Sequence, residues 1–186
     1  MSSPLAHSLT GTALLLAFAP EKPGRPRLLL TLAAGAVLAN MPDVDFLAAV
    51  LTSAPRAAVH RTATHSLAAA IAAGLAAGGT LGELLGVSRW RGRALATTAW
   101  LSHLVLDLLS ADSRPPAGLT LFWPLSSAFV PPWPLLPEVD ISRLLAGDSS
   151  GLASGLLVEL LLGMGLILAA LVRRRVAPLS PPTAIR

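Results

Sequence analysis

Two apolar stretches, residues 66–87 and 151–172, are each long enough to cross a membrane as a helix. The hydrocarbon core of a bilayer requires about 20 helical residues. The 186-residue chain is 53% hydrophobic, above the apolar share of most soluble domains, and its mean hydropathy is +0.66. Leu and Ala dominate while aromatic residues make up only 4%, which favours helices over strands. We therefore predict an all-α integral membrane helical bundle.

Three further apolar segments, 4–19, 28–39 and 94–110, extend this bundle to about four to five transmembrane or partially inserted helices. The first two are shorter than a full span, so either they cross thinned bilayer or one of them is partially inserted. Segment 28–39 is predicted to end at the turn before Pro42, because the residue before a proline disfavours helix. Residues 46–51 form a further apolar piece at the surface.

We predict one domain, residues 1–175, followed by a disordered tail at 176–186. Residues 17–19 read Ala-Phe-Ala and resemble a signal-peptidase site. However, no basic residue precedes that apolar stretch, and Pro20 would follow the cut. We interpret segment 4–19 as a retained first helix.

The basic residues lie in short clusters between the apolar segments. Nine Lys and Arg occur in the loops 20–27, 88–93 and 173–175, which share one side if the segments alternate. The positive-inside rule places that side in the cytoplasm and predicts a multi-pass protein of the inner (plasma) membrane. Such clusters orient membrane helices, so the net charge of +4 does not predict nucleic-acid binding.

All four histidines and three of the ten acidic residues fall at the opposite, non-cytoplasmic ends of the segments, although charged residues make up only 13% of the chain. Ionisable groups at membrane depth are costly and are usually functional. These residues are our candidate metal ligands: His7, Asp43, Asp45, His60, His65, His103 and Asp107.

His103 and Asp107 are four residues apart in a predicted helix, so both side chains project from one face. They can offer one nitrogen and one oxygen to a divalent metal, or form a structural hydrogen-bonded pair. Asp43 and Asp45 follow a proline turn and can approach one centre as two ligands or as a ligand and a base. The alternative for that pair is helix capping.

His60 and His65 are five residues apart, which does not place them on one face of a helix. The spacing fits one ligand before a helix and one in its first turn, with Thr64 or Ser66 as a cap or an outer hydrogen-bond partner. Arg61 can bind an anionic group such as phosphate, or contact a lipid headgroup.

Glu159 lies about two turns into the last apolar segment. It is either a deeper ligand, an outer partner of the ligands, or a buried carboxyl group that forms a hydrogen bond between helices.

The absence of cysteine excludes disulfides, thiolate zinc ligands and thiol nucleophiles. A His and Asp ligand set suits Zn²⁺, with Mn²⁺ or Fe²⁺ as alternatives, in a hydrolytic centre. Seven candidates exceed what one tetrahedral ion needs, which favours a two-metal cluster acting on a phosphoester. The candidate catalytic residues are Asp43 and Asp45, as ligand or base, and Arg61, as a contact for the anion.

The order and spacing of these motifs resemble a known family. The motifs are His7, Met41-Pro-Asp-x-Asp, His60-Arg-x-x-Thr-His-Ser, His103-x-x-x-Asp and residues 118–126, Gly-Leu-Thr-Leu-Phe-Trp-Pro-Leu-Ser. They are similar to membrane-bound, metal-dependent hydrolases that include the LexA-regulated, YdjM-like inner-membrane proteins. The resemblance covers about residues 1–130. Met41 stands where Leu is common and Ser110 where Thr is common; neither is a candidate ligand.

The resemblance implies a metal-dependent hydrolase, and the family's distant similarity to zinc-dependent phospholipase C implies phosphoester hydrolysis. We expect a lipid or lipid-linked substrate, cleaved by metal-activated water near the non-cytoplasmic face. Trp123 and Trp133 in the long loop after the fourth segment would mark the membrane interface. The alternative is a non-catalytic metal-binding membrane protein, either a transporter component or a sensor. A transporter should carry its ligands along the midplane of several helices. The sequence determines neither the substrate nor the oligomeric state.

Overall fold

The structure is a computed structural model that describes residues 2–18, 24–53, 59–113, 115–139, 147 and 152–176. Within these ranges the regular structure is helical, with two isolated β-bridges and no strand, so the all-α prediction is confirmed. The elements are α1 (Pro4–Phe18), α2 (Arg25–Asn40), η1 (Met41–Val44), α3 (Asp45–Thr52), η2 (Ala63–His65), α5 (Leu67–Leu85), α6 (Arg89–Leu109) and α8 (Leu152–Val176).

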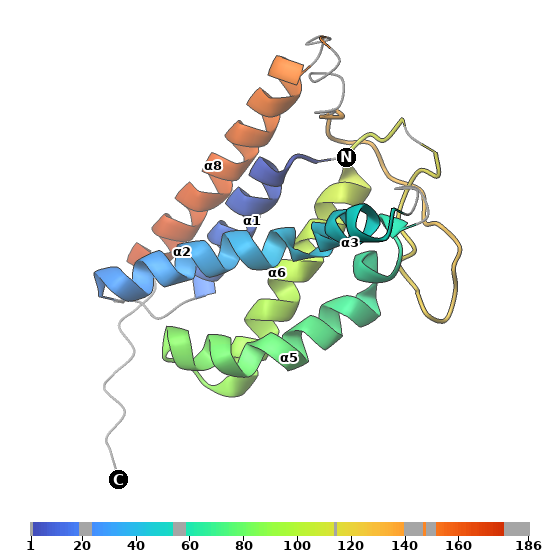
Figure 1. The fold of residues 1–186 in the computed structure, drawn as a ribbon. Helices are drawn as coiled ribbons and strands as arrows, with labels where there is room; N and C mark the ends of the chain where they lie inside the picture. The colour runs from blue at the N-terminus through green and yellow to red at the C-terminus, as the bar shows by residue number, and fades with distance from the viewer. Residues whose placement is uncertain are drawn as a thin grey trace.

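Helix α1 contacts α2, α6 and α8, and α5 packs along α6 (Figure 1). Glycines allow these close contacts: a Cβ atom added to Gly11 would lie 2.3 Å from the carbonyl oxygen of Gly35. A Cβ atom added to Gly78 would lie 2.2 Å from the Cα atom of Arg93. Such helix contacts through small residues are typical of membrane bundles. The first helix is therefore an integral part of the bundle.

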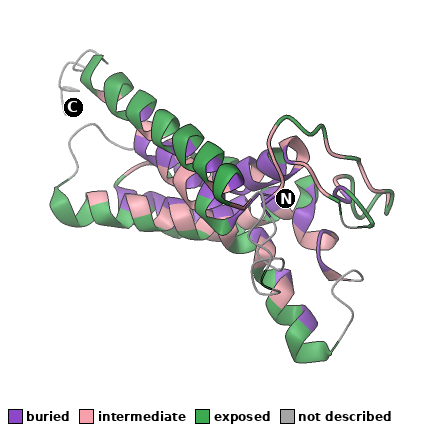
Figure 2. Cartoon of the chain, turned by 90° about the horizontal axis from the view of Figure 1, so that it is seen from above, coloured by how far each residue is buried: buried purple, intermediate pink, exposed green. Residues whose placement is uncertain are grey.

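Three helical stretches are long and apolar enough to cross a membrane by length and composition: Arg25–Thr52, Leu67–Leu85 and Leu152–Val176. Helix α1 is a shorter apolar helix. Only 22% of the most apolar window of α8 is buried inside the protein. Exposed residues cover the outward faces of the helices, while buried residues gather along the inner faces (Figure 2). An apolar surface of this extent is a lipid-facing surface, which identifies a membrane protein.

The predicted end of the second segment was wrong in one respect. The α-helix α2 does end at Asn40, but the chain continues through η1 into α3 without a non-helical residue. Pro42 lies in the first turn of η1, where a proline needs no backbone N–H and its fixed φ angle fits. The helical stretch therefore spans 28 residues, Arg25–Thr52, rather than 28–39.

The basic stretch 88–93 is the start of a helix rather than a turn. Ser88 caps α6, because its side chain accepts a hydrogen bond of 3.3 Å from the backbone N–H of Arg91. Helix α8 similarly continues beyond the predicted end at Val172 and includes the arginine triplet. The predicted tail lies outside the described residues beyond Val176.

The arginines of α6 and α8 meet at the C-terminal end of α1. Arg91 donates a hydrogen bond of 2.8 Å to the carbonyl of Phe18, and Arg173 donates one of 3.1 Å to the carbonyl of Ala17. His7 lies at the other end of α1. The predicted separation of ligands from basic clusters is therefore present in the fold. Which end faces the cytoplasm stays a prediction.

Candidate metal centre

The seven candidate ligands come together from separate elements of the chain. His7 lies in the first turns of α1, His65 is in η2, and His103 and Asp107 lie near the C-terminal end of α6. The other three are Asp43 in η1, Asp45 at the start of α3 and His60 in the turn after it. All are buried except Asp43, whose side chain is 20% exposed.

Four of these side chains aim one atom each at a common point. His65 Nε2 lies 3.1 Å from His103 Nε2, 3.5 Å from Asp43 Oδ1 and 3.8 Å from Asp107 Oδ2. His103 Nε2 lies 3.5 Å from Asp43 Oδ1 and 3.3 Å from Asp107 Oδ2. Zinc bonds to N and O ligands are about 2.0–2.2 Å long, which sets the ligand atoms of a tetrahedral site roughly 3.3–3.6 Å apart. The two histidine nitrogens therefore lie at distances from each other and from both carboxylates that are close to those in a tetrahedral metal site.

His7 and His60 enlarge this group on either side. The ring of His7 stacks on His103 with the centroids 3.8 Å apart, and its Nε2 lies 3.5 Å from Asp107 Oδ1. His7, His103 and Asp107 offer ligand atoms within 4.8 Å of one another, and Asp43, His60 and His65 do the same. Two neighbouring groups of three ligands could hold two ions.

Five polar atoms in this cluster lack hydrogen-bond partners within the described part of the protein. Both ring nitrogens of His7, His60 Nε2, Asp43 Oδ1 and Asp107 Oδ2 are buried and form no hydrogen bond. Leaving a buried polar atom unpaired costs about 1–3 kcal/mol, so native proteins rarely do so without a reason. A divalent cation would satisfy these atoms together, and the donor set therefore fits a metal.

Asp45 lies behind two of the histidines rather than among the four converging atoms. Its Oδ1 is 2.8 Å from His60 Nδ1, and its Oδ2 is 3.2 Å from His65 Nδ1. Oδ2 also accepts a hydrogen bond of 2.9 Å from Thr64 Oγ1 and one of 3.2 Å from the Arg61 backbone N–H. An ionised carboxylate only accepts, so it keeps protons on the Nδ1 atoms and leaves both Nε2 atoms available to a metal.

His103 is oriented in the same way by the backbone. Its Nδ1 lies 2.8 Å from the carbonyl oxygen of Ala39, which fixes the proton there and turns Nε2 to the common point.

The charge around His65 favours a cation. Burial lowers the pKa of His65, but the nearby Asp43 and Asp45 carboxylates outweigh this effect and raise the pKa to about 9. The carboxylates therefore stabilise positive charge at this point, whether a proton or a metal ion supplies it.

The capping alternative for Asp43 and Asp45 is wrong. The residues at the cap positions of η1 and α3 are Asn40 and Val44, and neither has a side-chain capping bond. Ser66 is the cap of α5, since its side chain accepts from the backbone N–H of Ala69 at 3.1 Å. His65 consequently lies just before this helix and not in its first turn.

Arg61 forms an ion pair that the sequence did not indicate. Its guanidinium contacts the Asp112 carboxylate, with Nη2 3.0 Å from Oδ1, and donates to the carbonyl of Pro116 at 3.1 Å. The Arg61 carbonyl accepts a bond of 3.1 Å from the Thr120 backbone N–H. Arg61 thus joins the turn that carries His60 to the segment after α6. The predicted contact with an anionic substrate stays a prediction.

Glu159 holds the N-terminal residues beside the ligands and is not one of the converging groups. The backbone N–H of Ser3 donates to Glu159 Oε1 at 2.8 Å, and the Ser3 hydroxyl contacts Oε2. The Ser2 backbone N–H donates to Asp107 Oδ1 at 3.3 Å. Of the alternatives for Glu159, the structure shows the hydrogen-bonding one. The sequence signal for Glu159 is the free-energy cost of burying an acid in an apolar helix.

Fold and site together define an all-helical membrane protein with buried His and Asp clusters that could hold metal at one end of the bundle. The chain belongs to the YdjM inner membrane protein family, which matches residues 1–177. The match extends beyond the region that carries the motifs. No curated protein and no solved structure is similar enough to match. Hydrolytic activity and similarity to phospholipase C stay predictions.

Proposed function

We propose that this protein is a membrane-bound, metal-dependent hydrolase that cleaves a phosphoester of a lipid or lipid-linked substrate. The observation that carries the proposal is the convergence of His65 Nε2, His103 Nε2, Asp43 Oδ1 and Asp107 Oδ2 at 3.1–3.8 Å. These distances are close to those in a tetrahedral metal site. The unpaired nitrogens of His7 and His60 lie on opposite sides of these atoms, and each would complete one group of three ligands if two ions bind.

The divalent ion, with Zn²⁺ the first choice and Mn²⁺ or Fe²⁺ as alternatives, would lower the pKa of a coordinated water and neutralise phosphoryl charge. Asp43, His65, His103 and Asp107 would hold the first ion. His7 would add a ligand on the Asp107 side, and His60 on the Asp43 side.

We assign Asp43 to the side of the centre from which the substrate would enter, because its side chain is the most exposed of the ligands. It is also the carboxylate placed to accept a proton from water on that side. Asp45 already accepts hydrogen bonds at both oxygens, so we assign it the positioning of His60 and His65. We assign Arg61 to the same supporting structure, since Asp112 neutralises its charge.

The surroundings of Asp43 support a substrate with a polar head and an apolar tail. Val44 at the end of η1 is exposed, and so are Leu47 and Leu51 of α3, which follows directly. Trp123 and Trp133, in the segment after α6, are also exposed. A lipid could therefore present its headgroup to the ligands while its chains remain in contact with apolar surface.

The test combines metal analysis with turnover on the full chain in nanodiscs. Phosphatidyl lipids and isoprenyl phosphates are the substrates, and phosphate or headgroup release is the readout. We expect stoichiometric metal and turnover in the wild type, and loss of both in Asp107→Ala. Ser102→Ala is the matched control, because Ser102 lies on the same helix and, among the described residues, its hydroxyl bonds only to the carbonyl of Ala99, at 2.7 Å.

Metal bound without turnover of any substrate would favour the non-catalytic alternative, a transporter component or sensor. Protein without stoichiometric metal would refute both functions.

A further inference from the structure

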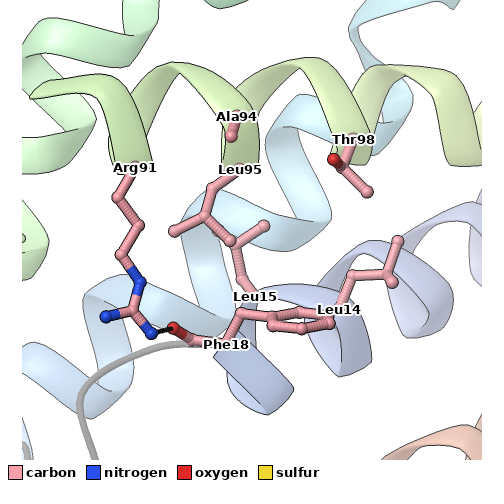
Figure 3. Close-up of a pocket in the computed structure, with 7 residues that line it drawn as sticks. All are labelled: Leu14, Leu15, Phe18, Arg91, Ala94, Leu95 and Thr98. Carbon is pink, nitrogen blue, oxygen red and sulfur yellow. Dashed lines mark hydrogen bonds between the residues drawn. The ribbon is translucent and has the colours of Figure 1, made fainter.

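Two apolar cavities lie along α1 and reach its C-terminal end, the end opposite His7. The first, of about 250 Å³, lies between α1 and α6 and is lined by Leu14, Phe18, Leu95 and Arg91 among others (Figure 3). The second, of about 270 Å³, lies between α1 and α8. Leu14 and Phe18 line both cavities, so these two side chains form a ridge between two parallel apolar grooves.

An arginine lines each groove. Arg91 of α6 lines the first groove, and its guanidinium points to the carbonyl oxygen of Phe18, 2.8 Å away (Figure 3). Arg173 of α8 lines the second, donates to the carbonyl of Ala17, and places its guanidinium carbon 4.2 Å from the centroid of the Phe18 ring. Both cations are therefore held at the last turn of α1.

The positive charges of Arg91 and Arg173 are not neutralised by a carboxylate among the described residues. Among the described residues, the ion pairs formed by arginines are Arg61–Asp112 and Arg89–Glu83, and neither involves Arg91 or Arg173. The carbonyl groups at the end of α1 carry only the partial charge of a helix C-terminus. Two cations beside two apolar grooves are complementary to an anion with apolar chains attached.

We propose that this end of α1 binds one anionic glycerophospholipid. Its phosphate would lie against Arg91 and Arg173, and its two acyl chains would follow the two grooves beside Leu14 and Phe18. Basic pockets between membrane helices recognise anionic headgroups in this way. This inference is independent of the proposed hydrolase, because the arginines that would bind the phosphate lie at the opposite end of α1 from His7.

The charge is tested first, by native mass spectrometry of the full chain with phosphatidylglycerol and phosphatidylcholine of identical acyl chains. We expect the wild type to retain phosphatidylglycerol preferentially. Each arginine near an anionic headgroup contributes about fivefold, so Arg91→Gln and Arg173→Gln should each reduce the preference by about that factor, and the double variant by about 25-fold. Arg91→Lys should keep the preference, because it retains the positive charge. This result would show that the loss in Arg91→Gln comes from the missing charge and not from misfolding.

Arg89→Gln is the matched control, since Arg89 precedes Arg91 on the same helix, pairs with Glu83 and lines neither groove. It should leave the preference unchanged. The grooves are tested with Ala94→Phe and Ala169→Phe, which fill one groove each and leave both arginines in place. Each should weaken retention of both lipids.

Equal retention of the two lipids by the wild type would overturn the proposal, as would an equal loss in Arg89→Gln and Arg91→Gln. Metal content, measured on the same samples, should stay unchanged in every variant. A loss of lipid preference with metal retained therefore concerns this site alone.

Discussion

The two ends of α1 treat polar groups in opposite ways. At the His7 end, histidines and carboxylates face one another in a buried cluster, and several of their atoms have no hydrogen-bond partner in the described part of the chain. At the Phe18 end, the polar groups satisfy one another: arginines from α6 and α8 donate to the last carbonyls of the helix. One end keeps unpaired ligand atoms, and the other keeps unpaired positive charge.

This difference shows where a ligand would stabilise the protein. A buried polar atom without a hydrogen-bond partner costs free energy. Such atoms are therefore expected where a ligand or metal ion binds them, which is at functional sites. Carbonyls that arginine satisfies at a helix C-terminus need no further group, although the arginine charge remains available to an anion. The first three of the following predictions test these two ends, and the fourth tests the packing between α5 and α6.

The largest effect should come from removing a converging ligand. His103→Ala or Asp107→Ala should abolish stoichiometric metal binding, because each variant removes one of the converging ligand atoms. Elemental analysis of purified protein measures the loss. Arg91→Gln, at the other end of α1, should retain the full metal content. A comparable loss in Arg91→Gln would show that the two ends are coupled.

Asp45→Asn should have a smaller effect at the same end. Asparagine removes the charge that orients His60 and His65 but leaves all four converging atoms in place. Loss of such an outer partner typically reduces metal affinity 10–100-fold. Competition with a chelator of known affinity gives the constant, and saturating metal should restore the wild-type stoichiometry. A complete loss of metal would instead make Asp45 a direct ligand.

Metal affinity should rise with pH at the His65 end. The pKa of His65 is about 9, so the imidazole is protonated at neutral pH and a metal must displace that proton. Affinity should therefore fall about tenfold for each pH unit below 9, for the one proton released. Calorimetry in buffers of different ionisation enthalpy counts this proton. Lipid preference at the Phe18 end should stay constant from pH 6 to 9, because arginine remains charged.

The smallest effect concerns packing between α5 and α6. A methyl group at Gly78 would meet the backbone of Arg93 at 2.2 Å, whereas one at Gly79 has no neighbour within 4 Å. Gly78→Ala should destabilise the fold by about 1–3 kcal/mol. Gly79→Ala should be neutral or stabilise it by up to about 1 kcal/mol through helix propensity. Thermal unfolding in detergent compares the two, and equal shifts would contradict the packing.

The sequence by itself determined the helical segments, the list of candidate ligands and the separation of these ligands from the basic clusters. These follow from local properties: apolar length sets a spanning helix, a four-residue spacing sets a shared helix face, and the cost of charge in lipid restricts where histidines and acids can occur. The apolar pattern did not determine where each helix starts. A capping bond at Ser88 begins α6 five residues before the apolar segment 94–110.

Only the tertiary structure decided how each atom is used. Asp43 and Asp45 differ by two positions in sequence, yet one faces His103 and the other faces the outer nitrogens of His60 and His65. Gly78 and Gly79 are adjacent, yet only Gly78 contacts α6. Such differences arise from contacts between distant segments, and the direction of a side chain relative to them cannot be read from neighbouring residues.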